Sequence, residues 1–261
     1  MRICVLVATM NQTDYSLLKK IGIKTEAVVV NQCEKDSVEN IDYAGNKITW
    51  VNTTQRGLSK SRNMALSYVK EADICLIADE DEVLSENYVS IISNAFEKNK
   101  KADIISFNFS KSNIDRERLA TYRNNTNKKS KWFHFYSSVS LAFRYDKILK
   151  NGIHFNELIG AGTKYTSGEE AVFLSACRKK GLKVFEREDV ICDVDFSNSI
   201  WFSGHDEKFF HDKGVFLAIA YGWSAKIFAL YFVFRLHGHT ELKSKKMLSA
   251  INAGIKEWRE M

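Results

Sequence analysis

Five short runs of apolar residues, separated by segments with helical periodicity, most strongly constrain how this chain can fold. The runs have the length of strands and cover residues 2–8, 27–30, 47–51, 73–78 and 104–109. Apolar residues at spacings of three and four predict helices between them, at 14–20, 58–70 and 86–98. Strands that are apolar on both faces are expected in a parallel sheet covered by helices on both sides. The sequence therefore predicts an α/β fold with a doubly wound, mostly parallel central sheet.

The second half of the chain is less regular. We expect a strand at 138–143, a glycine-marked loop at 159–162, a helix at 168–180 and one or two short strands within 184–192. From residue 206 onward the pattern is helical. We therefore divide the chain into two halves of one domain, at 1–110 and 111–205, followed by a helical C-terminal extension at 206–261.

Length, hydrophobic content and cysteine usage agree with a cytoplasmic globular protein. The chain has 261 residues and is 45% hydrophobic, enough for a substantial core. Its five cysteines are odd in number, lack C-x-x-C spacing and mostly lie in apolar runs, so we expect reduced thiols and neither disulfides nor zinc ligands. The first strand begins near residue 2 and leaves no room for a signal peptide, which again favours the cytoplasm.

Positive charge is concentrated in residues 98–131, which hold ten Lys or Arg against three acids, whereas the whole chain carries a formal charge of +6. Such a segment suits nucleic acid, an anionic membrane surface or a phosphorylated small molecule, and a solvated loop is the remaining alternative. Aromatic residues follow at 132–136, but no nucleic-acid-binding signature accompanies them. We therefore expect no nucleic-acid partner.

An apolar stretch at residues 215–234 is interrupted only by Gly222, Ser224 and Lys226. It is nearly long enough to span a bilayer, but Lys226 at its middle would cost about 2.5–3.5 kcal/mol on insertion. We predict a pair of helices bent near Gly222 instead of a span. Core packing and contact with the inner face of a membrane remain alternatives for this pair.

Four consecutive carboxylates, Asp79 to Glu82, follow the apolar run at 73–78. Four like charges repel one another, so this strand end must be solvated or must hold a cation. Ligands of doubly wound sheets bind beyond the carboxyl ends of the strands, where Thr9 to Asn11 and Asn31-Gln32 are also expected. The sequence therefore predicts one polar crevice with a candidate metal site. A solvated turn before the next helix is the alternative.

Residues 57–63, Gly-Leu-Ser-Lys-Ser-Arg-Asn, precede and open the predicted helix at 58–70. Gly57 permits a turn, Ser59 is a candidate cap, and Arg62 falls in the first turn. The helix dipole and the free N–H groups attract anions there, so a phosphate would suit this position. An ordinary capped helix with a solvated arginine is the alternative.

Taken in order, residues 57–63, Asp79-Glu80-Asp81 and Gly168-Glu169-Glu170 resemble the family-two inverting glycosyltransferases of the GT-A fold, of the type that assembles bacterial capsule, exopolysaccharide or lipooligosaccharide. The resemblance implies that residues 1–110 bind a nucleotide sugar and that residues 111–205 bind the acceptor. It implies that Asp81 binds Mn²⁺ or Mg²⁺, that Asp79 contacts the metal and the donor, and that Glu80 lies beside them. Glu82 is expected only at the rim.

The same resemblance implies roles for further residues. Arg62 would neutralise charge on the departing diphosphate. Glu170 would be the general base on the acceptor hydroxyl, with Glu169 as a rival because the family more often has Asp at this position. Thr9, Asn11, Asn31 and Gln32 would hold the base and ribose, with UDP as the expected nucleotide. His211 is a candidate contact to metal or phosphate, although a packing histidine is the alternative.

The sequence thus predicts a metal-dependent inverting transferase that moves a sugar from a UDP-sugar to a glycan or lipid-linked acceptor. No Q-x-x-R-W motif is present, which argues against a processive synthase. Two alternatives remain open: a GT-A domain that binds a nucleotide without turnover, and a sugar nucleotidyltransferase. Residues 9–12 do not form the glycine- and lysine-rich phosphate loop that the nucleotidyltransferase would need.

Overall fold

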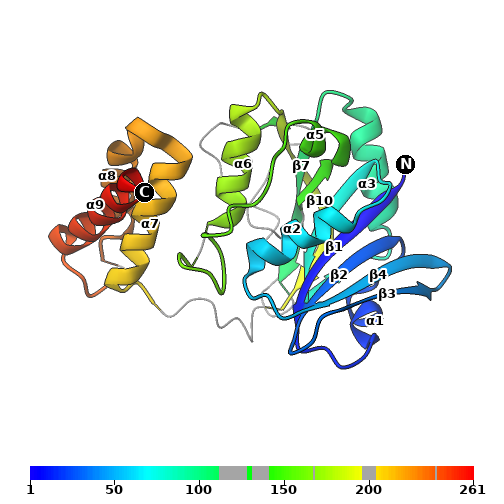
Figure 1. Cartoon of the computed structure of the whole chain (residues 1–261). Coiled ribbons are helices and arrows are strands. Elements are labelled where there is room, and N and C mark those ends of the chain that lie inside the picture. Colours follow the sequence, from blue (N-terminus) through cyan, green and yellow to red (C-terminus); the bar gives the residue numbers. More distant parts are fainter. Residues whose placement is uncertain (112–127, 131–140, 167, 196–203, 239) are drawn as a thin grey trace.

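The computed structural model describes residues 1–111, 128–130, 141–166, 168–195, 204–238 and 240–261. One large sheet lies between two layers of helices, and a separate group of helices stands beside it (Figure 1). The α/β fold and the helical C-terminal extension that the sequence predicts are confirmed.

The strands are β1 (Ile3–Met10), β2 (Glu26–Gln32), β3 (Ser37–Tyr43), β4 (Asn46–Thr53), β5 (Ile74–Asp79), β6 (Glu82–Leu84), β7 (Ile104–Lys111), β8 (Lys128–Lys129), β9 (Leu141–Arg144) and β10 (Val184–Val194). The helices are α1 (Ser16–Ile21), α2 (Leu58–Tyr68), α3 (Tyr88–Lys98), α5 (Tyr145–Lys150), α6 (Glu169–Lys179), α7 (Glu207–Tyr221), the 3₁₀ turn η1 (Gly222–Ser224), α8 (Ala225–Leu236) and α9 (Ser244–Glu260).

The sheet is more mixed than the expected, mostly parallel one. Its strand order is β3-β4-β2-β1-β5-β9-β7-β10-β6, with β8 paired to β10. Strands β4, β2, β1 and β5 form one parallel block, and β7 and β10 form another. Between the blocks, β9 runs antiparallel to both β5 and β7. Two further strands pair antiparallel, β3 with β4 and β6 with β10. The sequences of β3 and β6 lack the apolar runs that predicted the parallel strands.

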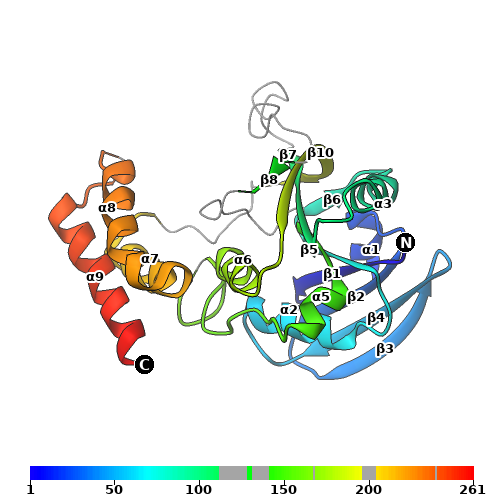
Figure 2. The same cartoon turned by 90° about the horizontal axis from the view of Figure 1, so that it is seen from above.

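Alternate side chains of the central strands supply two cores. On one face Val5 and Val7 of β1 pack with apolar residues of α1 and α3. On the other face Cys4 and Leu6 pack with apolar residues of α2, α5 and α6. Figure 2 shows the two groups of helices on opposite sides of the strands. The central strands are therefore buried on both faces, as their near-continuous apolar sequences predicted.

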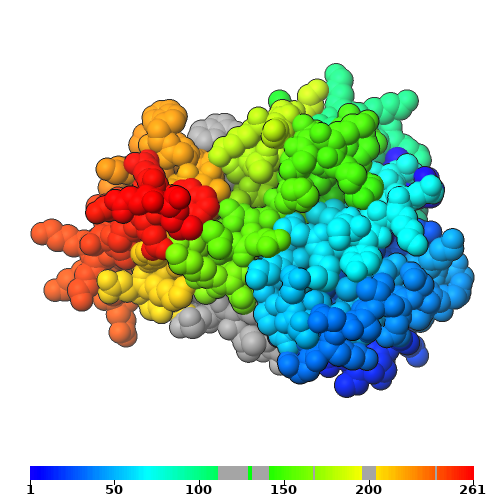
Figure 3. Space-filling model, in the orientation of Figure 1, coloured from blue at the N-terminus to red at the C-terminus, as the bar shows by residue number. Residues whose placement is uncertain are grey.

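The helices α7, α8 and α9 form a third core. The helices α7 and α9 approach so closely that a Cβ atom on Gly254 would lie 2.0 Å from the carbonyl oxygen of His211, and one on Gly214 would lie 2.0 Å from that of Ile251. The predicted bend is confirmed, because α7 ends at Tyr221 and Gly222 has a φ of 57°. Figure 3 shows this extension packed against the segment that precedes α6.

Several further expectations can be placed on the described residues. All five cysteines are free, and four of them are buried, as predicted. Half of the basic segment at 98–131, namely residues 112–127 and 131, and the aromatic residues at 132–136 lie outside the described part of the chain. The boundaries at 110 and 205 adjoin residues that the structure does not describe, and they stay predictions.

Replacing Gly254 with Ala tests the close contact of α7 and α9. The added methyl group would meet a backbone carbonyl, so we expect the gain in helix propensity to be outweighed and the free energy of unfolding to fall by about 1–3 kcal/mol. Urea denaturation measures the change. Ala253→Ser, at an exposed position of the same helix, should change it by less than about 0.5 kcal/mol. Equal or greater stability of Gly254→Ala would contradict the packing described above.

Candidate active site

Arg62, the fifth residue of α2, is the centre of a buried charged cluster. Its side chain is 1% exposed. Nη1 donates to Glu170 Oε1 at 2.7 Å and lies 3.6 Å from Glu169 Oε1. Nη2 donates to both carboxylate oxygens of Asp79 at 3.1 Å. One guanidinium therefore joins the end of β5 to the start of α6, over a sequence separation of about a hundred residues.

Three carboxylates compensate for the burial of this arginine. Burial opposes its charge, but the charges of Asp79, Glu170 and Glu169 outweigh that effect and raise the pKa of the Arg62 guanidinium. The guanidinium also lies 5.5 Å from the centre of the Phe155 ring. Within the described residues its Nε atom has no hydrogen-bond partner. From the sequence we expected Arg62 to face a bound phosphate. In the structure its two Nη atoms instead donate to carboxylates of the protein itself.

The start of α2 is held by residues distant in sequence. Gln32 accepts a hydrogen bond from the Gly57 N–H at 2.8 Å, and Ala161 accepts one from Leu58 at 2.9 Å. The expected cap Ser59 makes no helix cap; its hydroxyl donates instead to the Ile159 carbonyl at 2.5 Å. Gly160, with a φ of 119°, leaves room for this contact, because a Cβ atom there would lie 3.1 Å from Ser59 Oγ.

The four carboxylates after β5 have different environments. Asp79 contacts Arg62, and Glu80 accepts hydrogen bonds from Thr9 Oγ1 and, at 3.1 Å, from the Met10 N–H. Glu82, expected at the rim, is instead fully buried and accepts from the Asp79 N–H at 3.1 Å. Burial, followed by the charges of Asp79 and Asp81, raises the pKa of Glu82 well above its usual range. In this run Asp79 thus faces Arg62, whereas Glu80 and Glu82 hold neighbouring backbone N–H groups.

Asp81 is the carboxylate of this run best suited to a cation. It is half-buried, and burial together with the charges of Asp79 and Glu80 raises its pKa. In the described part of the chain it makes no ion pair, and no three His, Cys, Asp or Glu side chains there are grouped around a common metal position. Mg²⁺ and similar hard cations are commonly held by one or two carboxylates together with substrate phosphates. The donor set therefore fits a metal that a diphosphate helps to hold.

The two glutamates that open α6 are distinguished by their contacts. Glu170 makes the short ion pair with Arg62. Glu169 accepts a hydrogen bond from the Gly168 N–H at 3.0 Å. Burial, and then the neighbouring charge of Glu170, raises the pKa of Glu169 to about 8. Burial therefore favours the protonated form of Glu169, and the nearby Arg62 opposes this shift.

Lys213 of α7 is a charged residue near these glutamates to which the sequence gave no role. Burial lowers the pKa of its amine, and the charges of Glu169 and Glu170 oppose that shift. Its Nζ lies 5.3 Å from the ring centre of Phe216 and 5.4 Å from that of Phe209. The sequence shows several phenylalanines near Lys213, but only the fold places Lys213 and these rings close to the start of α6.

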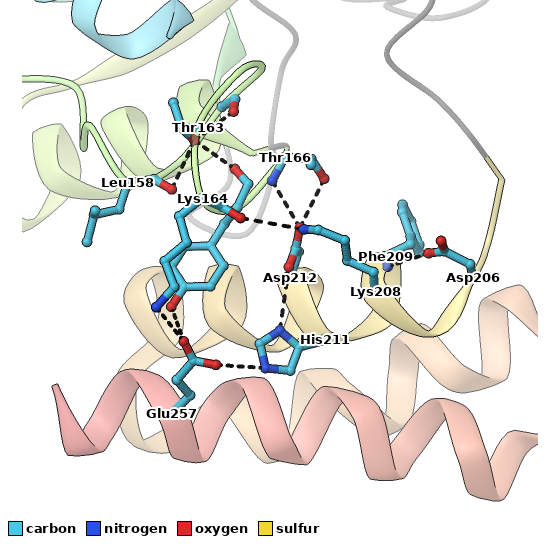
Figure 4. Close-up of polar contacts among 12 residues, drawn as sticks. Leu158, Thr163, Lys164, Thr166, Asp206, Lys208, Phe209, His211, Asp212 and Glu257 are labelled. Carbon is cyan, nitrogen blue, oxygen red and sulfur yellow. Dashed lines mark hydrogen bonds and ion pairs between the residues drawn. The ribbon is translucent and has the colours of Figure 1, made fainter. Parts of the chain in front are cut away.

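His211 is not brought to the acidic strand end in the described structure. Its Nε2 lies 3.0 Å from Glu257 of α9, and its Nδ1 lies 3.5 Å from Asp212 (Figure 4). Asp212 accepts from both the N–H and the hydroxyl of Thr166 at 3.0 Å, and Glu257 accepts from the Tyr165 hydroxyl at 2.6 Å. This polar network ties the loop before α6 to the helical extension.

The nucleotide-site candidates lie at adjoining strand ends, as predicted, and three of them hold neighbouring loops. Thr9 contacts Glu80, and Gln32 contacts Gly57. Asn31 is fully buried, accepts from the Gln12 N–H at 3.0 Å and donates to the Gln12 carbonyl at 2.9 Å. Asn11 is exposed and has a φ of 53°.

A cleft of about 560 Å³ opens beside these residues, at the carboxyl ends of β1, β2 and β4. Its lining consists of Gln12, Thr13, Asp14, Tyr15, Cys33, Glu34, Lys35, Glu39, Trp50 and Asn52. Most of these residues were not singled out by the sequence, because they follow the strands in loops without a motif. The predicted contact Asn31 thus supports the cleft through Gln12 and Asn52, whereas Gln32 holds the start of α2.

Comparison with known proteins agrees with this arrangement. The residues 1–349 of S. aureus TarS have a similar structure, with a TM-score of 0.64 and 16% sequence identity over 97% of this chain and 79% of that one. The same fragment in complex with UDP-GlcNAc has a TM-score of 0.62 and 17% identity, over 91% and 73% of the two chains. At such identities the likeness establishes the fold alone, and it confirms the predicted GT-A fold. No curated protein matches the chain by sequence.

A sequence model of one family also matches. The model described as glycosyl transferase family 2 covers residues 8–162, which is more than half of the 261 residues and includes the end of β1, all of α2 and the acidic end of β5. The predicted family is confirmed, and this chain belongs to glycosyl transferase family 2.

Proposed function

We propose that this protein transfers a sugar from a UDP-sugar to an acceptor hydroxyl with inversion at the anomeric carbon. The observation that carries the proposal is the Arg62 cluster, which holds Asp79 of the acidic strand end and Glu170 of α6 on one guanidinium. Arg62 thereby fixes the position of Asp79, which would lie near the donor, relative to Glu170, the candidate base. Family membership supports the reaction class.

The cleft beside β1, β2 and β4 is the proposed site of the nucleoside. It adjoins the acidic run, since Gln12 both lines the cleft and lies 3.3 Å from Glu80 Oε2. The Tyr15 ring, which packs edge-on to Trp50 at 5.0 Å, offers an aromatic surface to a base. That a protein of the same fold is solved with UDP-GlcNAc supports a uridine nucleotide here.

Asp81 would hold Mn²⁺ or Mg²⁺ together with the diphosphate. When bound, this cation neutralises negative charge that develops on the departing nucleoside diphosphate. Asp79, whose oxygens face Arg62, orders the turn that presents Asp81. His211 has no part in this proposal, because its partners are Asp212 and Glu257.

Glu170 is the proposed general base. Arg62 orients its carboxylate at 2.7 Å, and its low exposure, 12%, keeps bulk water away. It would remove the proton from the acceptor hydroxyl as that oxygen attacks the anomeric carbon opposite the diphosphate. Glu169 retains its own proton up to a pH of about 8 and positions the start of α6.

The acceptor is proposed to be a glycan or a lipid-linked sugar of bacterial surface polysaccharide assembly. The family resemblance of the ordered motifs supports this class. A domain that binds nucleotide without turnover is the competing function, and the activity assay below separates the two.

A donor screen tests the transferase and its metal together. With Mn²⁺ present, we expect one nucleotide sugar to release nucleoside diphosphate, and chelation with EDTA to abolish the release. Asp81→Asn should lower the rate by about 10²-fold or more, because the cation loses its carboxylate ligand. Asp146→Asn, on an exposed part of α5, is the matched control and should retain activity. Absence of turnover with every donor, or full activity of Asp81→Asn, would contradict the proposal.

Two neighbouring amide substitutions test the base. We expect Glu170→Gln to lower the transfer rate by about 10²- to 10⁴-fold, since an amide cannot accept the proton. Glu169→Gln resembles the protonated side chain that the site already holds, and it should keep most of the activity. The product's anomeric configuration, read by NMR, should be inverted. The opposite ranking of the two variants would make Glu169 the base.

The pH dependence of stability tests the protonation of Glu169. Its pKa is raised from 4.5 to about 8 on folding, so the folded state keeps a proton that the unfolded state loses above pH 4.5. Stability from this group is therefore full below pH 4.5, falls between about 4.5 and 8 by at most about 1.4 kcal/mol per pH unit, and then levels off. Urea denaturation from pH 5 to 8 should show a steeper decline for wild type than for Glu169→Gln. Parallel declines would show that Glu169 is ionised in the folded protein.

A further inference from the structure

Five large apolar side chains form an exposed stripe along η1 and α8, which we name the α8 stripe. Trp223 is 86% exposed and Phe234 is 82% exposed, and Ile227, Leu230 and Tyr231 are each more than half exposed. Their spacing of three or four residues places them on one side of the helix. Isolated exposed apolar residues are common in soluble proteins, but a contiguous row of this size marks an interaction surface.

The opposite side of α8 is already occupied. Ala225 and Ala229 are fully buried, and Phe228 and Phe232 pack against the core formed with α7 and α9. The helix is thus apolar on both sides, and among the described residues only one side has a protein neighbour. An apolar face is expected to be covered when the protein is at work.

Basic side chains flank the α8 stripe. At 100° per residue, Lys226 falls on one edge and Arg235 on the other, and Arg235 lies 3.5 Å from the Tyr231 hydroxyl within the stripe. Three exposed lysines, Lys243, Lys245 and Lys246, open the adjoining helix α9. Tryptophan and tyrosine in an apolar row bordered by Lys and Arg are typical of surfaces that lie at the headgroup level of an anionic bilayer.

The arrangement fits a helix lying on a membrane better than one crossing it. By length and composition, the stretch Glu207–Leu236 is the one candidate span among the described residues. The chain turns at Gly222, however, and the α7 part of the stretch is committed to protein, since Val215 and Leu217 are fully buried. Only the α8 part exposes its apolar side chains.

We propose that the α8 stripe binds the surface of an anionic phospholipid membrane, with its apolar side chains in the headgroup boundary and Lys226 and Arg235 at lipid phosphates. The interaction is independent of the proposed transfer reaction, because it involves only α8 and its neighbours. In a cell it would place the protein at the inner face of the plasma membrane.

Sedimentation of the full chain with lipid vesicles tests this, without donor or acceptor present. We expect binding to vesicles of phosphatidylcholine mixed with phosphatidylglycerol, weaker binding to phosphatidylcholine alone, and weakening by salt. Trp223→Ser combined with Phe234→Ser should lower the binding constant at least about tenfold. Lys226→Glu combined with Arg235→Glu should remove the preference for anionic lipid. Leu149→Ser, at an exposed apolar position of α5, is the matched control.

All four substituted positions of the α8 variants are exposed, so folded variants are expected, and circular dichroism checks this. The proposal is overturned if wild type binds neither vesicle, or if the Trp223/Phe234 variant binds as tightly as wild type. It is also overturned if light scattering shows a wild-type dimer that this variant abolishes, since a second copy would then cover the stripe. A catalytically inactive protein that still binds vesicles would contradict the proposed reaction and leave the membrane surface standing.

Discussion

Burial of one arginine among several carboxylates is the constraint on which the rest of the site depends. The guanidinium of Arg62 stays charged when it is buried, so carboxylates must lie beside it, and Asp79, Glu169 and Glu170 do. Protons offset the acidic excess, because the pKa values of Glu169 and Glu82 are both raised. Moving α2, β5 or α6 alone would leave a charge unpaired in a region that excludes water. The cluster therefore fixes three elements with respect to one another.

The helical extension contacts the loop that leads into α6, the helix that carries Glu169 and Glu170. Asp212 of α7 holds Thr166, and Glu257 of α9 holds Tyr165, only a few residues before Glu169. The side chain of Phe216 lies 3.1 Å from the place where Gly168 would carry a Cβ atom. Residues of the helical C-terminal extension thus support the loop that presents the proposed base.

Much of the fold could be predicted from the sequence, because the parallel strands and their helices carry strong periodic patterns. The strand β3, with alternating half-buried and exposed residues, and the three-residue β6 lack such patterns. The ordered motifs placed Arg62, Asp79, Asp81 and Glu170 in one region, and the structure joins three of these four directly. The burial of Glu82, the role of Asn31 in holding a loop, and the partners of His211 could not be predicted, since each depends on residues that only tertiary folding brings near.

The strand β9 has a further consequence for how the two parallel blocks of the sheet are related. Ala142 pairs with Leu76 of β5 on one side and with Ile105 of β7 on the other. Within the described sheet, β9 is the only strand between the blocks, and it has four residues, Leu141–Arg144. It therefore acts as a narrow seam. The angle between the block of β1, β2, β4 and β5 and the block of β7 and β10 is therefore fixed by the backbone hydrogen bonds of β9, by the two cores that extend across this seam, and by the bridge of Arg62 from β5 to α6.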